Sequence, residues 1–289
     1  MKLYVSNNGE LLENNGPTIE AGNRGYLYGD GLFESIRVIN GEPINLDVHI
    51  LRVLEGMAVM KMRIPTFFTQ DFFYKKIKEV FIKSNLHEGA KVRLSIDRIS
   101  GGTYRPISNE VTYFIEVYPL NNNQFKLNDK GIEVDLCQTI KKEKNCLSNF
   151  KTKNALPFVM ASIEAAEKNL DDILLTDKKG AIVESTSSNI FLVSNGILYT
   201  PGLEEGCVGG TMRMTIINLA LENNMRVYES PIMPQSLFYA DEAFLTNAIN
   251  GITWIGGFRT KRYVNNTSQY LITLLNNQYL SLGSELESK

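Results

Sequence analysis

Two Asn-Gly dipeptides set the strongest constraint on how this chain folds. Asn40-Gly41 follows the strand-like run GLFESIRVI, after which EPINL resumes extended structure, and Asn195-Gly196 separates NIFLVS from ILYTP in the same way. Asn-Gly between two apolar runs is typical of a two-residue hairpin turn. Because hairpins join antiparallel neighbours, tight turns between several strands favour mixed or antiparallel sheets over a doubly wound parallel sheet.

Helical patterns interleave with these strands. Asp47 is the predicted N-cap of one helix, whose apolar residues at helical spacing are Leu51, Leu54 and Ala58. A second helix begins near Thr69 and gathers on one face Phe73, Ile77, Val80, Phe81 and Leu86. A third carries a stripe formed by Leu156, Val159, Met160 and Ile163. Helices and strands mixed in this way predict the α+β class.

A polar stretch divides the chain. Residues 119–131, PLNNNQFKLNDKG, contain three consecutive asparagines and separate two strand-like runs. We therefore predict a small N-terminal α+β domain over residues 1–119, a linker over 120–130, and a larger C-terminal domain over 131–289. A chain of 289 residues is long enough for one large or two medium domains.

Composition excludes several functional classes. Lys plus Arg total 30 and Asp plus Glu total 32, so the net charge of −2 gives no broad attraction for nucleic acid or anionic membrane. Three scattered cysteines and two histidines predict neither a disulfide framework nor a zinc site. The N-terminus lacks the apolar region of a signal peptide, and no apolar run is long enough to span a bilayer. We therefore expect a cytoplasmic protein with no metal.

Two segments of the C-terminal half are suited to a charged ligand. In residues 208–220, VGGTMRMTIINLA, glycines run into a helix, whose exposed N–H groups and positive dipole end suit a phosphate. In residues 184–191, ESTSSNIF, Glu184 precedes five small polar residues that could form a hydrogen-bonded floor for a polar ring. Taken alone, the first is more often a flexible loop before a surface helix and the second a polar turn.

Basic residues supply the other candidates. Lys151 and Lys153 lie just before the third helix, and a catalytic lysine is one whose neutral amine can attack a carbonyl. Local composition does not say which lysine would do so, and a solvated charge is the commoner role. Arg52, one helical turn after His49, could bind a phosphate as a fork donor or form a surface ion pair.

Two glycine-rich segments of the N-terminal half could line a pocket. Residues 24–38, RGYLYGDGLFESIRV, place aromatic side chains and Glu34 around a turn, which could wall a pocket or simply begin a strand. In RLSIDRISGGTYRP, Arg98 and Arg105 flank a double glycine, an arrangement suited to carboxylate capture and also to plain solvent exposure.

The order and spacing of these segments resemble the class IV aminotransferases, the pyridoxal-phosphate enzymes of fold type IV. That family includes branched-chain and D-amino-acid aminotransferases and 4-amino-4-deoxychorismate lyase. The resemblance extends from about residue 24 to about residue 255. It rests on GYLYGDGLFESIRV, the helical HxxR, KTKN, ESTSSNIF, the TP of LYTP, GCVGGTMR and DEAFLTNAINGI. It implies a two-domain α+β fold with the cofactor in the interdomain cleft.

The resemblance also implies roles for individual residues. Lys151 matches the catalytic lysine that forms a Schiff base with pyridoxal 5′-phosphate, whereas the family pattern needs no lysine at Lys153. Glu184 matches the acid that pairs with the pyridine nitrogen, and Arg52 matches the arginine that binds the phosphate.

The other implied cofactor contacts lie in the C-terminal half. Thr211 and Met212 match residues whose backbone N–H groups hold the phosphate, and Asn247 with Ala248 match a second phosphate clamp. Val208 stands where many relatives pack a leucine under the ring. The same motifs add Ser188, Asn189 and Gly210 to the cofactor-binding set.

Substrate contacts are implied for Phe33 and Glu34, which match the pocket wall, and for Arg98 and Arg105. Thr103 stands where an arginine of the lyase contacts the substrate carboxylate, and Arg105 lies two residues further on. This departure favours an aminotransferase acting between an amino acid and a 2-oxo acid. The alternative is 4-amino-4-deoxychorismate lyase, which DRISGG and LTNAINGI resemble. A non-catalytic relative is a third possibility, but it would lack the lysine or the acid. Members of the family are homodimers.

Overall fold

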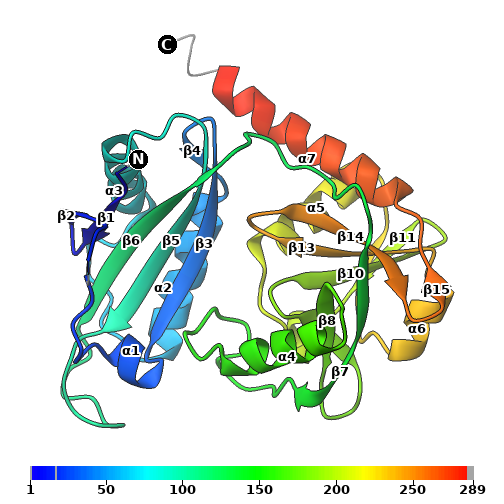
Figure 1. Ribbon diagram of the computed structural model, residues 1–289, viewed down its shortest axis with the longest axis horizontal. Coiled ribbons are helices and arrows are strands. Elements are labelled where there is room, and N and C mark those ends of the chain that lie inside the picture. The colour runs from blue at the N-terminus through cyan, green and yellow to red at the C-terminus, as the bar shows by residue number, and fades with distance from the viewer. Residues whose placement is uncertain (1, 17, 285–289) are drawn as a thin grey trace. The chain divides into compact units, whose positions relative to one another are not determined.

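The computed structural model describes residues 2–16 and 18–284. The chain divides into two compact units, and in Figure 1 both can be followed by their strand labels. The first unit comprises Met1–Gln124 and Phe150–Asn154, and the second comprises Phe125–Asn149 and Ala155–Lys289.

Lys151 groups with the first unit, although the sequence predicted it in the C-terminal domain. The reason is backbone pairing with a strand of the first unit. The Phe33 N–H donates to the Lys151 carbonyl, and the Lys153 N–H donates to the Gly31 carbonyl, each at 2.9 Å. An isolated bridge between Leu32 and Thr152 lies between these two bonds.

The first unit is built on a six-stranded sheet of order β2-β1-β6-β5-β3-β4. Each pair of neighbouring strands in this order is antiparallel, as the hairpin signals predict. Its strands are β1 (Tyr4–Asn7), β2 (Glu10–Glu13), β3 (Gly31–Ile39), β4 (Glu42–Pro43), β5 (Gly89–Arg98) and β6 (Val111–Leu120). Its helices are α1 (Arg24–Tyr28), α2 (Leu46–Val59) and α3 (Gln70–Lys83).

Helices α2 and α3 cover one face of this sheet (Figure 1). Helix α3 begins after Thr69, as predicted, with the Thr69 side chain as its cap. Its predicted apolar residues are buried, although Leu86 lies beyond the last helical residue, Lys83. The prediction for α2 was wrong in two respects: Asn45 is the N-cap, and Leu51 is 56% exposed. The helix also has a second apolar set at helical spacing, and the sheet buries that one instead: Leu46, Ile50, Val53 and Met57.

Both Asn-Gly hairpins are confirmed, one in each unit. Asn40-Gly41 joins β3 to β4 with φ of 50° and 79°, and Asn195-Gly196 joins β10 to β11 with φ of 52° and 72°. Positive φ at both central residues is the requirement of a type I′ turn, whose twist matches that of the flanking strands.

The second unit is built on a mixed sheet of nine strands. The path runs β12-β11-β10-β13-β14-β7-β8-β9, and β15 pairs with β14. The strands are β7 (Ile132–Lys141), β8 (Asp172–Thr176), β9 (Ile182–Ser185), β10 (Asn189–Ser194), β11 (Ile197–Thr200), β12 (Val227–Glu229), β13 (Glu242–Asn247), β14 (Gly251–Phe258) and β15 (Lys261–Arg262). Three pairs are parallel, and the predicted α+β class is confirmed.

Four α-helices and a short 3-10 turn accompany this sheet. They are α4 (Leu156–Glu167), η1 (Leu203–Glu205), α5 (Thr211–Glu222), α6 (Pro234–Tyr239) and α7 (Asn266–Ser284). The predicted stripe on α4 is exposed, with Leu156 68% accessible. The face of α4 that packs on the sheet instead presents the small residues Ala161 and Ala165, together with Glu164.

Candidate active site

Lys151 lies on the face of the first sheet opposite α2 and α3. Its bridge to β3 sets it beside Phe33, and its Nζ lies 4.6 Å from the centroid of the Phe33 ring. The guanidinium of Arg93, on β5, lies 4.2 Å from the same centroid. Phe33 therefore lies in contact with two basic side chains, one from β5 and one from the segment bridged to β3.

Glu34 lies on the opposite face, because successive residues of a strand alternate sides. The sequence predicted that Glu34 and Phe33 share a pocket wall, but their side chains lie on opposite faces of the sheet. Glu34 is 1% exposed, and α2 covers it. Arg52 donates from Nε to Oε1 at 2.8 Å and from Nη2 to Oε2, and His49 Nδ1 lies 2.7 Å from Oε2. Arg52 and Glu34 thus form a bidentate buried pair.

Glu34, Arg52 and His49 form a buried triad that favours the ionised form of the Glu34 carboxyl. Burial alone raises the pKa of Glu34, but Arg52 and His49 together outweigh it and bring that pKa from 4.5 to about 2. Burial lowers the pKa of His49, an effect that Glu34 opposes and to which Arg52 and Lys151 add. The carboxylate is therefore ionised at neutral pH and holds the Arg52 guanidinium in one orientation.

The two predicted substrate arginines differ in their surroundings. Arg105 is exposed on the loop after β5. Arg98 is 6% exposed and donates to Asp30 at 3.0 Å, to the Met60 carbonyl at 2.8 Å and to Asn109 at 2.5 Å. These bonds tie the end of β5 to the end of α2, so we do not retain Arg98 as a substrate contact.

In the second unit, the Glu184 carboxylate belongs to a small network of charged side chains and backbone groups. Its side chain lies on β9 and is 3% exposed. Lys142 forms an ion pair with Oε1, and the Val208 N–H donates to Oε2 at 2.9 Å. Lys142 was not among the residues predicted from the sequence, although it lies in the basic loop before Lys151. Its ammonium also lies 4.6 Å from the centroid of the Phe158 ring.

The remaining cofactor candidates gather around this network. Asn189 donates to the Val208 carbonyl at 2.8 Å, and Asn247 donates to the Ser188 hydroxyl at 2.9 Å. The Asn247 side-chain oxygen accepts from the backbone of the two residues after Ala248, at 3.0 Å and 2.8 Å. Asn247 therefore shapes the turn that contains Ala248.

The glycine-rich segment begins α5 as predicted. Gly210 is the N-cap and forms no side-chain cap hydrogen bond, and Thr211 and Met212 are the first helical residues. A Cβ atom at Gly210 would lie 2.0 Å from Asn189 Oδ1, so only glycine fits there. Nearby, burial and then Glu184 raise the pKa of the Cys207 thiol to about 12, which keeps it protonated and unreactive.

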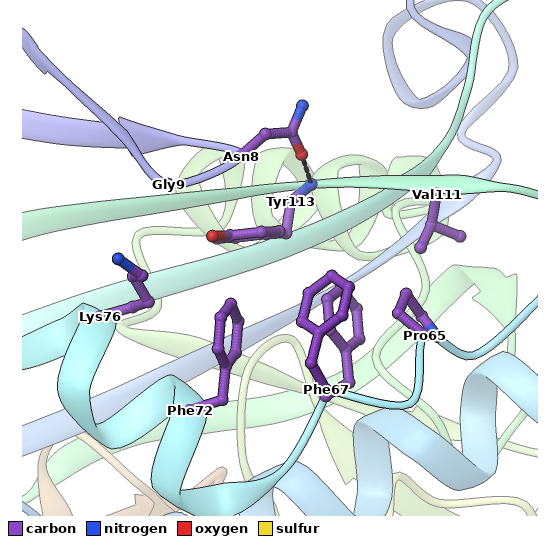
Figure 2. A pocket seen from close by; sticks show the side chains of 9 residues that line it. Asn8, Gly9, Pro65, Phe67, Phe72, Lys76, Val111 and Tyr113 are labelled. Atoms are coloured by element: carbon purple, nitrogen blue, oxygen red, sulfur yellow. Dashed lines mark hydrogen bonds between the residues drawn. The ribbon is translucent and has the colours of Figure 1, made fainter.

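A hollow elsewhere in the first unit contains none of the candidate residues. Figure 2 shows its wall of Phe67, Phe72 and Pro65, with Lys76 and Tyr113 nearby. Within residues 2–16 and 18–284, no three His, Cys, Asp or Glu side chains are grouped to hold a metal ion. The helices in this described part are also too short or too polar to cross a bilayer.

The chain is similar to known proteins over most of its length. The family model for amino-transferase class IV matches residues 31–256. A putative branched-chain-amino-acid aminotransferase of Methanocaldococcus jannaschii is 31% identical over 85% of this chain and 84% of its own length. The D-alanine aminotransferase of Bacillus licheniformis is 26% identical over 85% and 84%. The aminodeoxychorismate lyase of Vibrio harveyi is 23% identical over 83% and 87%.

Solved structures share the fold. The branched-chain aminotransferase of Thermoproteus uzoniensis, solved with norvaline, superposes with a TM-score of 0.87 at 22% identity, covering 94% of this chain and 93% of that one. The T.th. branched-chain amino acid aminotransferase with pyridoxamine 5′-phosphate gives 0.85 at 19% identity, covering 95% and 93%. Given the extent of the family match and the 31% identity, this chain belongs to the class IV aminotransferases.

Proposed function

We propose that the chain is a pyridoxal-phosphate-dependent aminotransferase in which Lys151 is the cofactor lysine. The observation that carries this assignment is the buried ion pair of Lys153, the other candidate lysine. The Lys151 amine lies over the Phe33 ring, whereas the Lys153 amine lies 2.6 Å from Asp97 Oδ1 in a buried ion pair. A lysine held as an ammonium by a carboxylate is a poor nucleophile, so Lys151 is the better candidate.

The side chains present fit pyridoxal phosphate in chemical type. Its aldehyde requires a primary amine, which Lys151 supplies. Each oxygen of Glu184 accepts one hydrogen bond from the described residues, and a carboxylate can accept about four in all, so Glu184 keeps capacity for a ring N–H. The phosphate ester suits the start of α5, where Gly210 provides no side-chain cap of its own, and the positive charge of Arg52.

When bound, pyridoxal phosphate supplies an electron sink for the carbanion at the substrate α-carbon. Within our proposal, Lys151 moves the proton at that carbon as general base and acid. Glu184, as an anion, holds a proton at the ring nitrogen. Arg52 and the N–H groups of Thr211 and Met212 bind the phosphate, and the pair with Glu34 keeps Arg52 oriented for that task.

The rest of the second-unit cluster would hold the cofactor in place. Val208 would pack under the ring and Asn247 with Ala248 would provide a second phosphate contact. Ser188, Asn189 and Gly210 support these residues through the hydrogen bonds and the close approach described above. For the substrate we retain Phe33 beside Lys151 and the exposed Arg105.

We propose an amino acid as the amino donor, either a branched-chain L-amino acid or D-alanine, after the named activities of the relatives. We further propose that the protein acts as a homodimer in the cytoplasm. The second candidate function is aminodeoxychorismate lyase, which the Vibrio harveyi relative favours. Supplying aminodeoxychorismate without any amino acceptor separates the two, because only the lyase then releases pyruvate continuously.

The test of the proposal is borohydride reduction of the protein with pyridoxal phosphate, followed by peptide mapping. We expect a pyridoxyl adduct on Lys151 in the wild type and in the exposed-lysine control Lys144→Met, and none in Lys151→Met. Amino-donor assays with L-leucine, L-valine and D-alanine then identify the substrate. An adduct on any other lysine of the wild type would refute the assignment.

A further inference from the structure

The segment that carries Lys151 pairs with its sheet through few backbone hydrogen bonds. Among the residues that the structure describes, its backbone pairing with β3 consists of two hydrogen bonds and one bridge, Leu32 to Thr152. Lys151 and Lys153 lie two residues apart, so their side chains point to the same face. A slip of two residues, about 6–7 Å along the strand, would exchange one lysine for the other without turning the segment over.

A buried ion pair opposes that slip. Lys153 Nζ lies 2.6 Å from Asp97 Oδ1 and donates to Oδ2 at 2.8 Å. Asp97 is fully buried on β5, and only 14% of the Lys153 side chain is exposed. Asn23 donates a further hydrogen bond to Asp97 Oδ2 at 3.1 Å. A carboxylate held in this way has little freedom to follow a moving lysine.

Gly31 makes the pair possible. On β3 it is the register partner of Asp97, and its carbonyl accepts the Lys153 N–H on the other side. The ion pair therefore crosses β3 directly over Gly31. A Cβ atom at Gly31 would lie 2.1 Å from Asp97 Oδ1 and 3.1 Å from Lys153 Cδ, so any other residue would push the two apart.

We propose that Lys153 is a positioning residue whose ion pair with Asp97, across Gly31, fixes the register in which Lys151 is presented beside Phe33. The inference deepens the proposed function and rests on it, because register matters only if one of the two amines must meet an aldehyde. The next row of the same face, two residues along, holds Lys151 beside Phe33, so locking one row places the other.

The decisive variant is Asp97→Asn, which keeps both amines and removes the charge that holds Lys153. Borohydride trapping and peptide mapping should show the share of label on Lys153 rising about tenfold or more, the factor that corresponds to about 1.4 kcal/mol of register preference. The matched control is Glu116→Gln, which removes a carboxylate from the same face of β6, where it lies 3.9 Å from Arg93. The control should label Lys151 alone.

A second measurement needs no cofactor. The double variant Asp97→Asn with Lys153→Met leaves no charge of the pair behind, and hydrogen exchange at the Phe33 amide then reports its bond to the Lys151 carbonyl. Protection of that amide should fall at least about tenfold while β5 and β6 amides stay protected. Unchanged protection here, or unchanged labelling in Asp97→Asn, would overturn the inference. A wild type that never labels Lys151 would instead defeat the proposed function, so the two failures are distinguishable.

Discussion

Each unit contains a buried glutamate whose carboxylate contacts basic side chains or backbone N–H groups. The two glutamates differ in the number and kind of these contacts. Glu34 in the first unit accepts two hydrogen bonds from Arg52 and lies 2.7 Å from His49 Nδ1. Glu184 in the second unit has one lysine and one backbone N–H. Glu34 thus has three nitrogen contacts within its own unit and orients Arg52, whereas Glu184 has two and keeps more capacity for a ligand. Burial alone does not distinguish a structural acid from a functional one; the count of its donors does.

The largest expected effect is at Glu184. Replacing it by Gln removes the anion proposed to hold a proton at the cofactor ring, so turnover should fall about a hundred- to a thousandfold, as for other lost electrostatic stabilisers. Steady-state assays with the best amino donor measure this. The control is Glu143→Gln, an exposed acid paired with Lys178, which should leave turnover unchanged. Equal losses of turnover in the two variants would contradict the role proposed for Glu184.

The next effect is on stability, at Glu34. Breaking its buried pair leaves Arg52 uncompensated, so Glu34→Gln should destabilise the first unit by about 3 kcal/mol at pH 7. Its pKa falls from 4.5 to about 2 on folding, so the ionised carboxylate stabilises the folded state fully above pH 4.5. That contribution is lost as the pH falls from 4.5 toward 2, and the variant and the wild type should converge there.

Urea unfolding by circular dichroism at several pH values measures this difference. The single tryptophan, Trp254, lies on β14 of the second unit, so its fluorescence reports that unit separately. The tryptophan transition should not move in Glu34→Gln. A gap between variant and wild type that stays constant from pH 7 to pH 2 would contradict the role given to the ionised carboxylate.

The smallest expected effects are on stability, at the turns of the two hairpins. Alanine at Gly41 or Gly196 must adopt a positive φ, which costs about 1 kcal/mol. Gly196→Ala should shift the Trp254 transition, and Gly41→Ala should shift only the transition of the first unit. Gly22→Ala is the control, because its φ is not positive and its added Cβ would only contact Ser100 at 3.5 Å. If both hairpin variants move both transitions equally, the units do not unfold independently.

Local signals in the sequence were sufficient for the fold class and for several elements. The Asn-Gly turns and the helix start at Thr69 depend only on neighbouring residues, and both were confirmed. The face of α2 was misassigned because that helix has two apolar sets at helical spacing, and only the sheet decides which is buried. Pairings across long separations were not predictable: Lys153 meets Asp97 56 residues away, and Lys142 meets Glu184 42 residues away.

The five residues that contain Lys151 belong to the first unit, while the chain on both sides of them belongs to the second. During synthesis, residues 1–124 therefore emerge from the ribosome before residues 150–154, which pair with the edge of their sheet. Domains generally fold as units, the N-terminal one first, but here the first unit includes five residues from beyond the start of the second. A ribosome-bound fragment ending at residue 124 would present β3 with an unfilled edge at Gly31–Phe33, and completion of the unit waits for residue 154.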